Sequence, residues 1–268
     1  MERFDPTRIR RAILDMAYSG GTVHIGCAFS IVELLAVLYR NHLRLAGPDQ
    51  ATEGRDYMVL SKGHGVMTLY ACLNEIGMLS DEDIKQYFRD GTRLKGLADV
   101  HVAGVEATTG SLGHGLSVGA GLALAAKRKK TDQISYVLVG DGELNEGAIW
   151  EAVLFAAHFK LDNLIVIVDK NGFQAMGSTH EVIELGSIEQ KFSAFGFDAL
   201  TVDGHDEAAV DAAYQSLKTN KNGRPKVIVA NTVKGKGVSF MEHDNTWHYT
   251  RLTPETYRAA IAELEVIV

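Results

Sequence analysis

The stretch "ISYVLVGDGELNEGAIWEAVLFAAHFKLDNLIVIVD" (residues 134–169) decides the predicted fold. It opens with the apolar run 134–139, continues through 146–160, where apolar residues recur at helical spacing, and closes with the apolar run 164–169. Strand, helix and strand in this order predict one right-handed βαβ crossover. Runs that are apolar throughout are typical of parallel strands covered on both faces. We therefore predict an α/β fold, a parallel β-sheet covered by helices on both faces.

The same pattern extends outward along the chain. "YMVLS" (57–61) and "KVIVAN" (226–231) are further strand candidates, and "DPTRIRRAILDMAY" opens a helix that Asp5 can cap and Pro6 can begin. We see no internal repeat, low-complexity tract or linker. We expect a single domain over residues 1–268.

Composition excludes several classes of protein. A net charge of −7 argues against nucleic acid as the main partner, because a duplex binder usually displays a basic face. The longest apolar runs fall short of the about 20 residues that span a bilayer, and the start lacks the apolar region of a secretory signal. Cys27 and Cys72 match neither a disulfide framework nor a zinc site. We expect a cytoplasmic protein that does not bind membranes.

Glycine-rich or histidine-bearing segments follow each of the four predicted strands. Because ligands of open parallel sheets bind outside the carboxyl ends of the strands, we expect these segments to meet at one rim and form a site. The segments are "SKGHG" (61–65), "GDGELNEG" (140–147), "DKNGFQAMG" (169–177) and "VKGKG" (233–237).

The acidic turn "GDGELNEG" is unusual for a phosphate site, since Asp141 would repel the phosphate. A divalent cation held between the two removes this conflict, and Mg²⁺ prefers the oxygen ligands available here. Asp141 supplies a carboxylate, Asn171 an amide oxygen and Phe173 a backbone carbonyl. We therefore expect Mg²⁺, or another divalent cation such as Ca²⁺ or Mn²⁺, at this turn.

The glycines of the turn fit the same interpretation. Gly140 and Gly142 let the backbone approach a diphosphate without a Cβ in the way, and the helix that begins near Glu146 offers its N-terminus. A lone "GDG" is nevertheless usually only a turn.

Asp141 and Asn171 lie 30 positions apart (171 − 141), with a strand–turn–helix–strand pattern between them. This spacing resembles the diphosphate-binding signature of thiamine diphosphate enzymes. Five longer blocks, in order, resemble the transketolase family and together cover most of the chain. They are "SGGTVHIGCAFSIVELLAVLY" (19–39), "RDYMVLSKGHGVMTLYA" (55–71), "GVEATTGSLGHGLSVGAGLA" (104–123), "GDGELNEGAIWEA" (140–152) and "TVKGKGVSFMEHDNTWHY" (232–249).

The resemblance implies the diphosphate-binding domain of the thiamine diphosphate-binding fold, with thiamine diphosphate and Mg²⁺ as cofactors. It implies transfer of a two-carbon ketol unit from a ketose, usually phosphorylated, to an aldose acceptor. Transketolases also have a pyrimidine-binding domain and a C-terminal domain, which this sequence does not match. The chain thus resembles the N-terminal subunit of a split transketolase, active only with a separate pyrimidine-binding subunit in an α2β2 heterotetramer. That other half would carry the glutamate that activates the cofactor.

The resemblance also implies roles for single residues. His64 and His248 match histidines near the diphosphate and the reaction centre, and His24 matches one that lines the substrate channel. Each could relay a proton with a pKa near neutrality. Glu146 matches a glutamate of a proton network between active sites, although a carboxylate at a helix N-terminus is an equally good explanation. The segment that approaches the cofactor is matched by Gly110, Leu112 and Gly113.

The sequence departs from the family at several positions. Leu97 and Ala98 stand where transketolases usually carry His-Pro, and His101 could compensate from a shifted place. Cys27 replaces a small residue, often glycine, and His114 replaces a glutamine. These departures leave the donor and acceptor sugars open and allow an unusual substrate of a specialised pathway.

Other readings remain at this point. One is a subunit of another split thiamine diphosphate enzyme, such as a 2-oxoacid dehydrogenase E1 α subunit or a deoxyxylulose phosphate synthase fragment. A second is a non-catalytic diphosphate-binding module. A plain nucleotide-binding protein is disfavoured because neither GxGxxG nor GxxxxGK[ST] is present.

Overall fold

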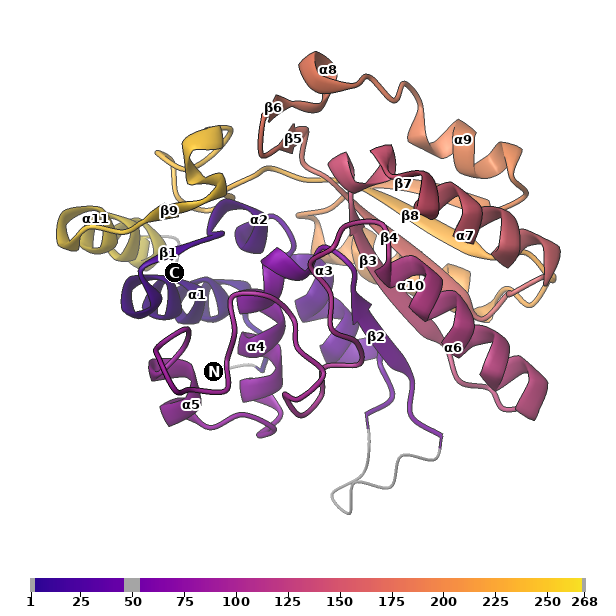
Figure 1. Ribbon diagram of the computed structural model, residues 1–268, viewed down its shortest axis with the longest axis horizontal. Coiled ribbons are helices and arrows are strands. Elements are labelled where there is room, and N and C mark those ends of the chain that lie inside the picture. Colours follow the sequence, from indigo (N-terminus) through magenta and orange to yellow (C-terminus); the bar gives the residue numbers. More distant parts are fainter. Residues whose placement is uncertain (1–2, 46–53, 267–268) are drawn as a thin grey trace.

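Five parallel strands form the central sheet of the protein, in the order β2-β3-β4-β8-β7 (Figure 1). The computed structural model describes residues 3–45 and 54–266. The strands of the sheet are β2 (Tyr57–Leu60), β3 (Ser135–Gly140), β4 (Leu164–Lys170), β8 (Lys226–Asn231) and β7 (Asp198–Asp203). Every neighbouring pair is parallel, so the carboxyl ends of all five strands point to one edge of the sheet.

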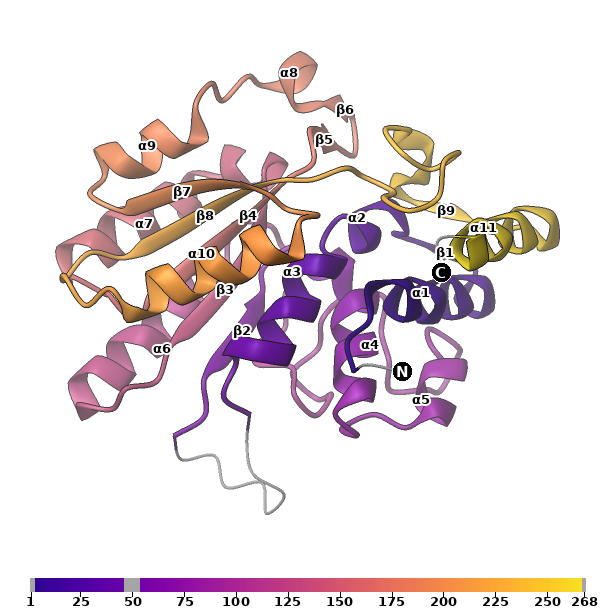
Figure 2. The same ribbon diagram turned by 180° about the vertical axis from the view of Figure 1, so that it is seen from behind.

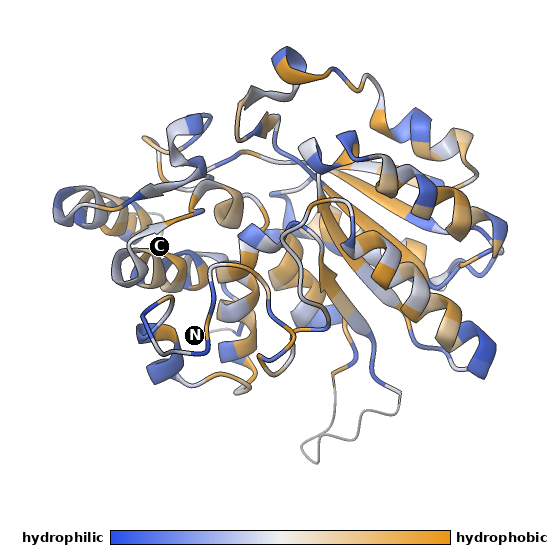
Figure 3. Ribbon diagram, viewed as in Figure 1, coloured by the Kyte–Doolittle hydropathy of each residue, from blue (hydrophilic) through white to orange (hydrophobic). Residues whose placement is uncertain are grey.

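Alternate side chains of the central strands enter two separate cores. On β3, Val137 and Val139 belong to one hydrophobic cluster, whereas Tyr136 and Leu138 belong to the other. This is the period of two that a strand imposes on its side chains. Both faces must therefore be covered, which explains why the strand sequences are apolar throughout (Figure 3).

Helices cover both faces of the sheet. One face is covered by α6 (Gly115–Lys129), α7 (Gly147–His158) and α9 (Ile188–Ala194). The other is covered by α3 (Val32–Val37) and α10 (Glu207–Thr219), which lie in front in Figure 2, while α4 (Val66–Glu75) packs against α3 in the same hydrophobic cluster. Outside α4 lie α1 (Pro6–Gly20) and, packed on it, α11 (Pro254–Val266).

Shorter elements complete the described chain. The helical ones are α2 (Gly26–Phe29), α5 (Asp81–Lys85) and α8 (Thr179–Val182), with single turns at Leu38–His42, Gly63–Gly65, Gly142–Asn145 and Asn245–His248. Two small antiparallel pairs join β1 (Thr22–Val23) to β9 (Thr250–Arg251) and β5 (Phe173–Gln174) to β6 (Gly177–Ser178). No helix in the two described ranges is long and apolar enough to cross a bilayer.

The α/β prediction is confirmed, and the four predicted strands lie within one residue of the observed ones at each end. The side chain of Asp5 accepts a hydrogen bond from the backbone N–H of Arg8, as its predicted capping role requires. The edge strand β7 was not predicted. Its residues are mostly half-buried or exposed, so its sequence lacks the continuous apolar run of an inner strand. The single-domain interpretation of 1–268 stays a prediction, since 1–2, 46–53 and 267–268 lie outside the described residues.

Candidate active site

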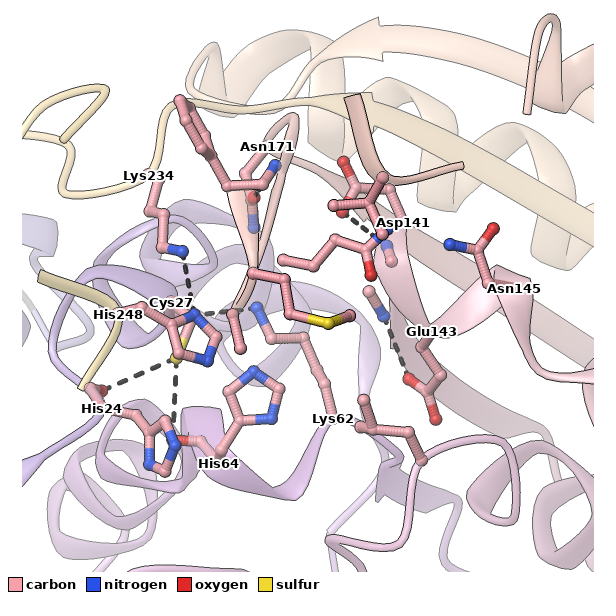
Figure 4. A pocket seen from close by; sticks show the side chains of 18 of the residues that line it. His24, Cys27, Lys62, His64, Asp141, Glu143, Asn145, Asn171, Lys234 and His248 are labelled. Carbon is pink, nitrogen blue, oxygen red and sulfur yellow. Dashed lines mark hydrogen bonds between the residues drawn. The ribbon is translucent and has the colours of Figure 1, made fainter. Parts of the chain in front are cut away.

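A cavity of about 580 Å³ opens at the carboxyl ends of β2, β3, β4 and β8. We call it the strand-end cavity; Figure 4 shows it from close by. The four segments predicted to converge all contribute to its wall, as the parallel topology requires. The predicted site residues that line it are His24, His64, Leu97, Gly110, Leu112, Gly140, Asp141, Gly142, Glu146, Asn171, Phe173 and His248.

Three histidines from distant parts of the chain gather on one side of the strand-end cavity (Figure 4). The ring centroid of His24 lies 5.1 Å from that of His64 and 5.3 Å from that of His248. The rings of His64 and His248 lie 5.6 Å apart. The structure thus brings together the three histidines that the sequence singled out.

These histidines do not titrate near neutrality, contrary to the expectation from their unperturbed pKa. Burial, reinforced by the charge of Lys234, lowers the pKa of His24 to about 4 and that of His248 to about 3. Burial, together with Lys62, lowers the pKa of His64 well below its usual value. All three rings are therefore neutral at pH 7, and each offers one hydrogen-bond donor and one acceptor.

A buried ion pair forms the floor of the strand-end cavity. The ammonium group of Lys62 contacts the carboxylate of Asp169, and both side chains are at most 2% exposed. Burial alone would lower the pKa of Lys62, but the charge of Asp169, its hydrogen bond with Lys62 and the other nearby acidic groups together outweigh burial and raise that pKa. The carboxylate also accepts hydrogen bonds from Ser30, Thr232 and Asn171. The pair is therefore charged and joined to the segments that carry Ser30 and Thr232 as well as to Asn171.

A second buried ammonium group, that of Lys234, lies beside the histidines. Its Nζ donates to Asn245 Oδ1 at 2.6 Å and lies 2.9 Å from His248 Nδ1. Burial, with a further contribution from Lys62, lowers the pKa of Lys234 to about 8. Since an ammonium group can only donate, Nδ1 of His248 accepts, and its neutral ring carries the proton on Nε2.

The acidic turn places Asp141 in the cavity wall with most of its surface buried. Its carboxylate accepts from the backbone N–H groups of Gly142, at 2.8 Å, and Gly172, at 2.6 Å. Burial, and then the negative charge of Asp169, raise the pKa of Asp141 to about 6. A positive ion beside this carboxylate would stabilise its charged form and lower its pKa again.

The amide of Asn171 is fixed in orientation next to Asp141. Its Nδ2 donates to Asp169 at 2.8 Å, so its oxygen faces the other way and accepts from the backbone N–H of Phe173 at 3.0 Å. Among the described residues no three His, Cys, Asp or Glu side chains converge as a metal cluster. The predicted ligand set is of a different kind, one carboxylate with an amide and a carbonyl oxygen, which is typical of a site that Mg²⁺ shares with a phosphate.

Two polar atoms in the cavity wall point to a missing polar ligand. Gln174 Nε2 and Asn145 Oδ1 are buried and have no hydrogen-bond partner among the described parts of the chain. A buried polar group without a partner is costly, so such atoms are normally satisfied by a ligand or water.

Glu143, rather than Glu146, is the carboxylate that holds the loops of the site together. It is 2% exposed and accepts from Ser61 Oγ at 2.5 Å, from the Gly113 N–H at 2.9 Å and from the Gly140 N–H at 3.1 Å. The ends of β2 and β3 and the loop before α6 therefore meet at one side chain. Glu146 is exposed at the cavity wall and directly precedes α7, so both of its interpretations remain open.

Gly113 lies just behind the cavity wall and does not line it. It has a φ of +90°, and a Cβ there would lie 2.7 Å from Cβ of Glu146. Gly110 does line the cavity; its φ is +142°, and a Cβ would lie 2.7 Å from Leu97 Cδ1. Glycine is therefore favoured at both positions by the positive φ and by the side chains that pack close to the backbone.

Leu97, which stands where transketolases usually carry histidine, gives the cavity an apolar wall. Leu97 lines the strand-end cavity and also a neighbouring cavity of about 370 Å³. His101 does not compensate, because its side chain is 88% exposed and its ring is anchored 2.7 Å from Asp99 Oδ1. His114 is exposed and outside the cavity, whereas Cys27 lines it, with Sγ 3.6 Å from the carbonyl oxygen of His24.

The sequence analysis missed Lys62, Asp169, Glu143 and Lys234. A signal was present, since all four residues stand within the named segments: Lys62 in "SKGHG", Glu143 in "GDGELNEG", Asp169 in "DKNGFQAMG" and Lys234 in "VKGKG". A charged residue directly after a buried strand is a candidate for a buried functional group.

Comparison with known proteins agrees with this geometry. Residues 6–264 match the family described as "Transketolase, thiamine diphosphate binding domain". The chain belongs to the transketolase family. The fold is that of its thiamine diphosphate-binding domain, and the chain is accordingly part of an enzyme.

Two relatives of this transketolase-family chain are separate subunits. It is 40% identical to an apulose-4-phosphate transketolase subunit of Phocaeicola vulgatus, over 95% of this chain and 90% of the relative. It is also 40% identical to the 6-deoxy-6-sulfo-D-fructose transketolase subunit SqwG of a Clostridium species, over 96% of this chain and 94% of the relative.

Solved transketolases share the fold over a part of their length. The transketolase of Campylobacter jejuni superposes with a TM-score of 0.90 at 30% identity, covering 97% of this chain and 42% of that one. The chain thus spans about two fifths of that full-length transketolase.

Proposed function

We propose that this chain is the N-terminal subunit of a split transketolase that depends on thiamine diphosphate and Mg²⁺. It would transfer a two-carbon ketol unit from a ketose, usually phosphorylated, to an aldose acceptor. The observation that carries the proposal is the strand-end cavity, in which neutral histidines, two buried ammonium groups and an acidic turn converge. The match to relatives named as subunits, over at least 90% of their length, supports the split organisation.

The residues of the cavity fit the cofactor. Asp141, Asn171 and the carbonyl group of Phe173 would hold the metal ion. The ammonium groups of Lys62 and Lys234 provide positive charge for the diphosphate, and Gln174 Nε2, which has no partner within residues 3–45 and 54–266, provides a further donor. Charge-assisted hydrogen bonds of this kind are the strong ones in anion binding.

Thiamine diphosphate, when bound, supplies the carbanion chemistry of the transfer, and the protein supplies binding, orientation and electrostatics. The neutral rings of His24, His64 and His248 can donate to and accept from sugar hydroxyl groups. Lys234 orients His248 so that its Nε2–H is the free donor. The buried walls keep water from the reacting groups.

A partner subunit would complete the site. The five matching blocks contain no counterpart of the glutamate that activates the cofactor in this family, and we propose that a separate pyrimidine-binding subunit carries it. We expect an α2β2 heterotetramer in the cytoplasm.

The substrate would be a sugar phosphate or a related anionic sugar. The two subunit relatives are named for apulose 4-phosphate and for 6-deoxy-6-sulfo-D-fructose. Leu97 offers no hydrogen bond to a hydroxyl group of the ketose, and the exposed His101 side chain does not line the cavity. The preferred ketose should therefore differ from that of a transketolase with histidine in place of Leu97.

Co-expression with the pyrimidine-binding subunit tests the proposal. The mixture should transfer a ketol unit from a screened ketose to ribose 5-phosphate and require both thiamine diphosphate and Mg²⁺. Neither of the two chains should be active by itself. Full turnover by this chain alone would contradict the split organisation, and pyruvate oxidation by the mixture would favour a 2-oxoacid dehydrogenase.

A further inference from the structure

The buried charge cluster formed by Arg10, Glu33 and His205 lies outside the strand-end cavity, and none of its members lines it. Arg10 belongs to α1 and Glu33 to α3, while His205 lies in the turn between β7 and α10. Arg10 and Glu33 are each 6% exposed. Moving charged groups out of water is costly, and a buried ion pair adds little net stability. Stability alone therefore does not explain the cluster.

The carboxylate of Glu33 joins two arms. Arg10 Nη2 lies 2.7 Å from Glu33 Oε1, and His205 Nδ1 lies 2.9 Å from Glu33 Oε2. Each arm continues to the backbone of one segment, residues 232–237, which we call the carrier segment. Arg10 Nε donates to the carbonyl oxygen of Lys236 at 2.7 Å, and the backbone N–H of Val233 donates to His205 Nε2 at 2.8 Å.

The two arms reach the carrier segment on either side of Lys234. A third anchor lies between them, because the backbone N–H of Gly235 donates to the carbonyl oxygen of Gly26 at 3.0 Å. The backbone on both sides of Lys234 is therefore tied to other elements. Its side chain extends from there to Asn245 and His248.

The turn that bears His205 packs tightly on the end of β8. The backbone N–H of Gly204 donates to the carbonyl oxygen of Asn231 at 2.8 Å, and a Cβ on Gly204 would lie 2.5 Å from Thr232 Cγ2. This close approach needs glycine and brings His205 within reach of Val233. The backbone contacts of Gly204 thus fix the place from which the imidazole ring of His205 extends.

The hydrogen bonds also define the protonation state of His205. A backbone N–H can only donate, so Nε2 of His205 accepts from Val233 and carries no proton. The proton of the neutral ring is on Nδ1, where it is donated to Glu33. Glu33 selects this tautomer, much as a second-layer carboxylate orients a ligating histidine.

We propose that Glu33 and His205, with Arg10, are positioning residues that place the ammonium group of Lys234 in the strand-end cavity by holding the carrier segment. The inference rests on the proposed function, because it assigns Lys234 to the diphosphate of the bound cofactor. It predicts that the acceptor at Nε2 of His205 matters more than the bulk of the ring.

Three substitutions distinguish the contact that Nε2 of His205 makes with Val233 from the contact that Nδ1 makes with Glu33. In His205→Gln the amide oxygen reaches the place of Nε2 and can still accept from Val233. In His205→Asn the shorter amide reaches only the place of Nδ1, and in His205→Ala both contacts are absent. His42→Ala is the matched control, because His42 is 8% exposed and bonded to Asp211 and Lys218 but lies outside the cavity.

Each variant is assembled with the pyrimidine-binding subunit, and the Kd for thiamine diphosphate with Mg²⁺ is measured by calorimetry under conditions where circular dichroism shows all variants folded. We expect His205→Ala and His205→Asn to raise the Kd about tenfold, the effect of one lost hydrogen bond. His205→Gln and His42→Ala should change it less than about threefold. The kcat at saturating cofactor should stay within about twofold in all four, because the change affects binding of the cofactor alone.

The outcomes distinguish a failure of the positioning role from a failure of the proposed function. An unchanged Kd in folded His205→Ala would overturn the inference and leave the proposed function intact. If His205→Ala does not fold, equal Kd values for the Gln and Asn variants would overturn it as well. A wild-type complex that binds no thiamine diphosphate would overturn the proposed function, and the inference with it.

Discussion

The ammonium group of Lys62 is paired with the carboxylate of Asp169 beneath the strand-end cavity, where both side chains are at most 2% exposed. The two residues lie 107 positions apart, and β3 separates the strands that carry them to the site. Lys62 follows β2, whereas Asp169 lies at the carboxyl end of β4. The pair fixes the floor on which the acidic turn and the histidines are arranged, and removing either partner would leave an uncompensated charge in the interior.

Lys62→Met should therefore destabilise the fold strongly. We expect the free energy of unfolding to fall by about 3–5 kcal/mol, the usual result of breaking a buried ion pair from one side. Urea denaturation measures it. Arg258→Ala is the control, because its pair with Glu255 is mostly exposed and should contribute about 0–1 kcal/mol. Equal losses in the two variants would contradict the assignment of a buried charged pair.

Asp141→Ala should abolish metal-dependent cofactor binding without unfolding the chain. The carboxylate lies in a turn and accepts from the backbone N–H groups of Gly142 and Gly172, so its loss should leave the core intact. We expect the Kd for thiamine diphosphate in the assembled enzyme to rise by about a hundredfold or more. Calorimetry in the presence of Mg²⁺ checks this, with the exposed Asp90→Ala as control. Unchanged affinity would remove Asp141 from the metal site.

The loop at 96–101 gives a prediction about specificity. Leu97→His restores a hydrogen-bonding group to the cavity wall, so kcat/KM for xylulose 5-phosphate should rise by about one to two powers of ten. His101→Ala should leave it unchanged, because the His101 side chain is 88% exposed. Both are measured in the complex with the partner subunit. A large loss in His101→Ala would show that this histidine reaches the substrate after all.

Glu33 gives a prediction about acid stability. Burial alone would raise its pKa, but the hydrogen bond from His205 and the charge of Arg10 bring that pKa below its usual value of 4.5. Unfolded chains then bind more protons than folded ones, so the stabilisation is present above pH 4.5 and is lost as the pH falls through the folded-state pKa. We expect the urea midpoint of the wild type to decline more steeply below pH 4.5 than that of Glu33→Gln. Parallel curves would contradict the assignment.

Much of the fold could be predicted from local patterns. The strands β2, β3, β4 and β8 were found because helices cover them on both faces, so their side chains are apolar almost throughout. The strand β7 was missed because its side chains are half-buried or exposed, so its sequence lacks a continuous apolar run. The three histidines and the acidic turn were found because they stand in segments that directly follow strands or match the family blocks.

The charged groups of the site, Lys62, Asp169 and Lys234, could not be predicted from sequence patterns. The roles of Lys62, Asp169 and Lys234 depend on partners that come from other segments, and a lysine or aspartate in a strand-end loop is by itself most often solvated. Likewise, the tautomer of His205 depends on Glu33, 172 positions away. Apolar periodicity reports what each residue does locally, and it determined the sheet and its covered faces. Burial, charge pairing and the shift of a pKa are set by what other segments place nearby, and these only the tertiary structure decided.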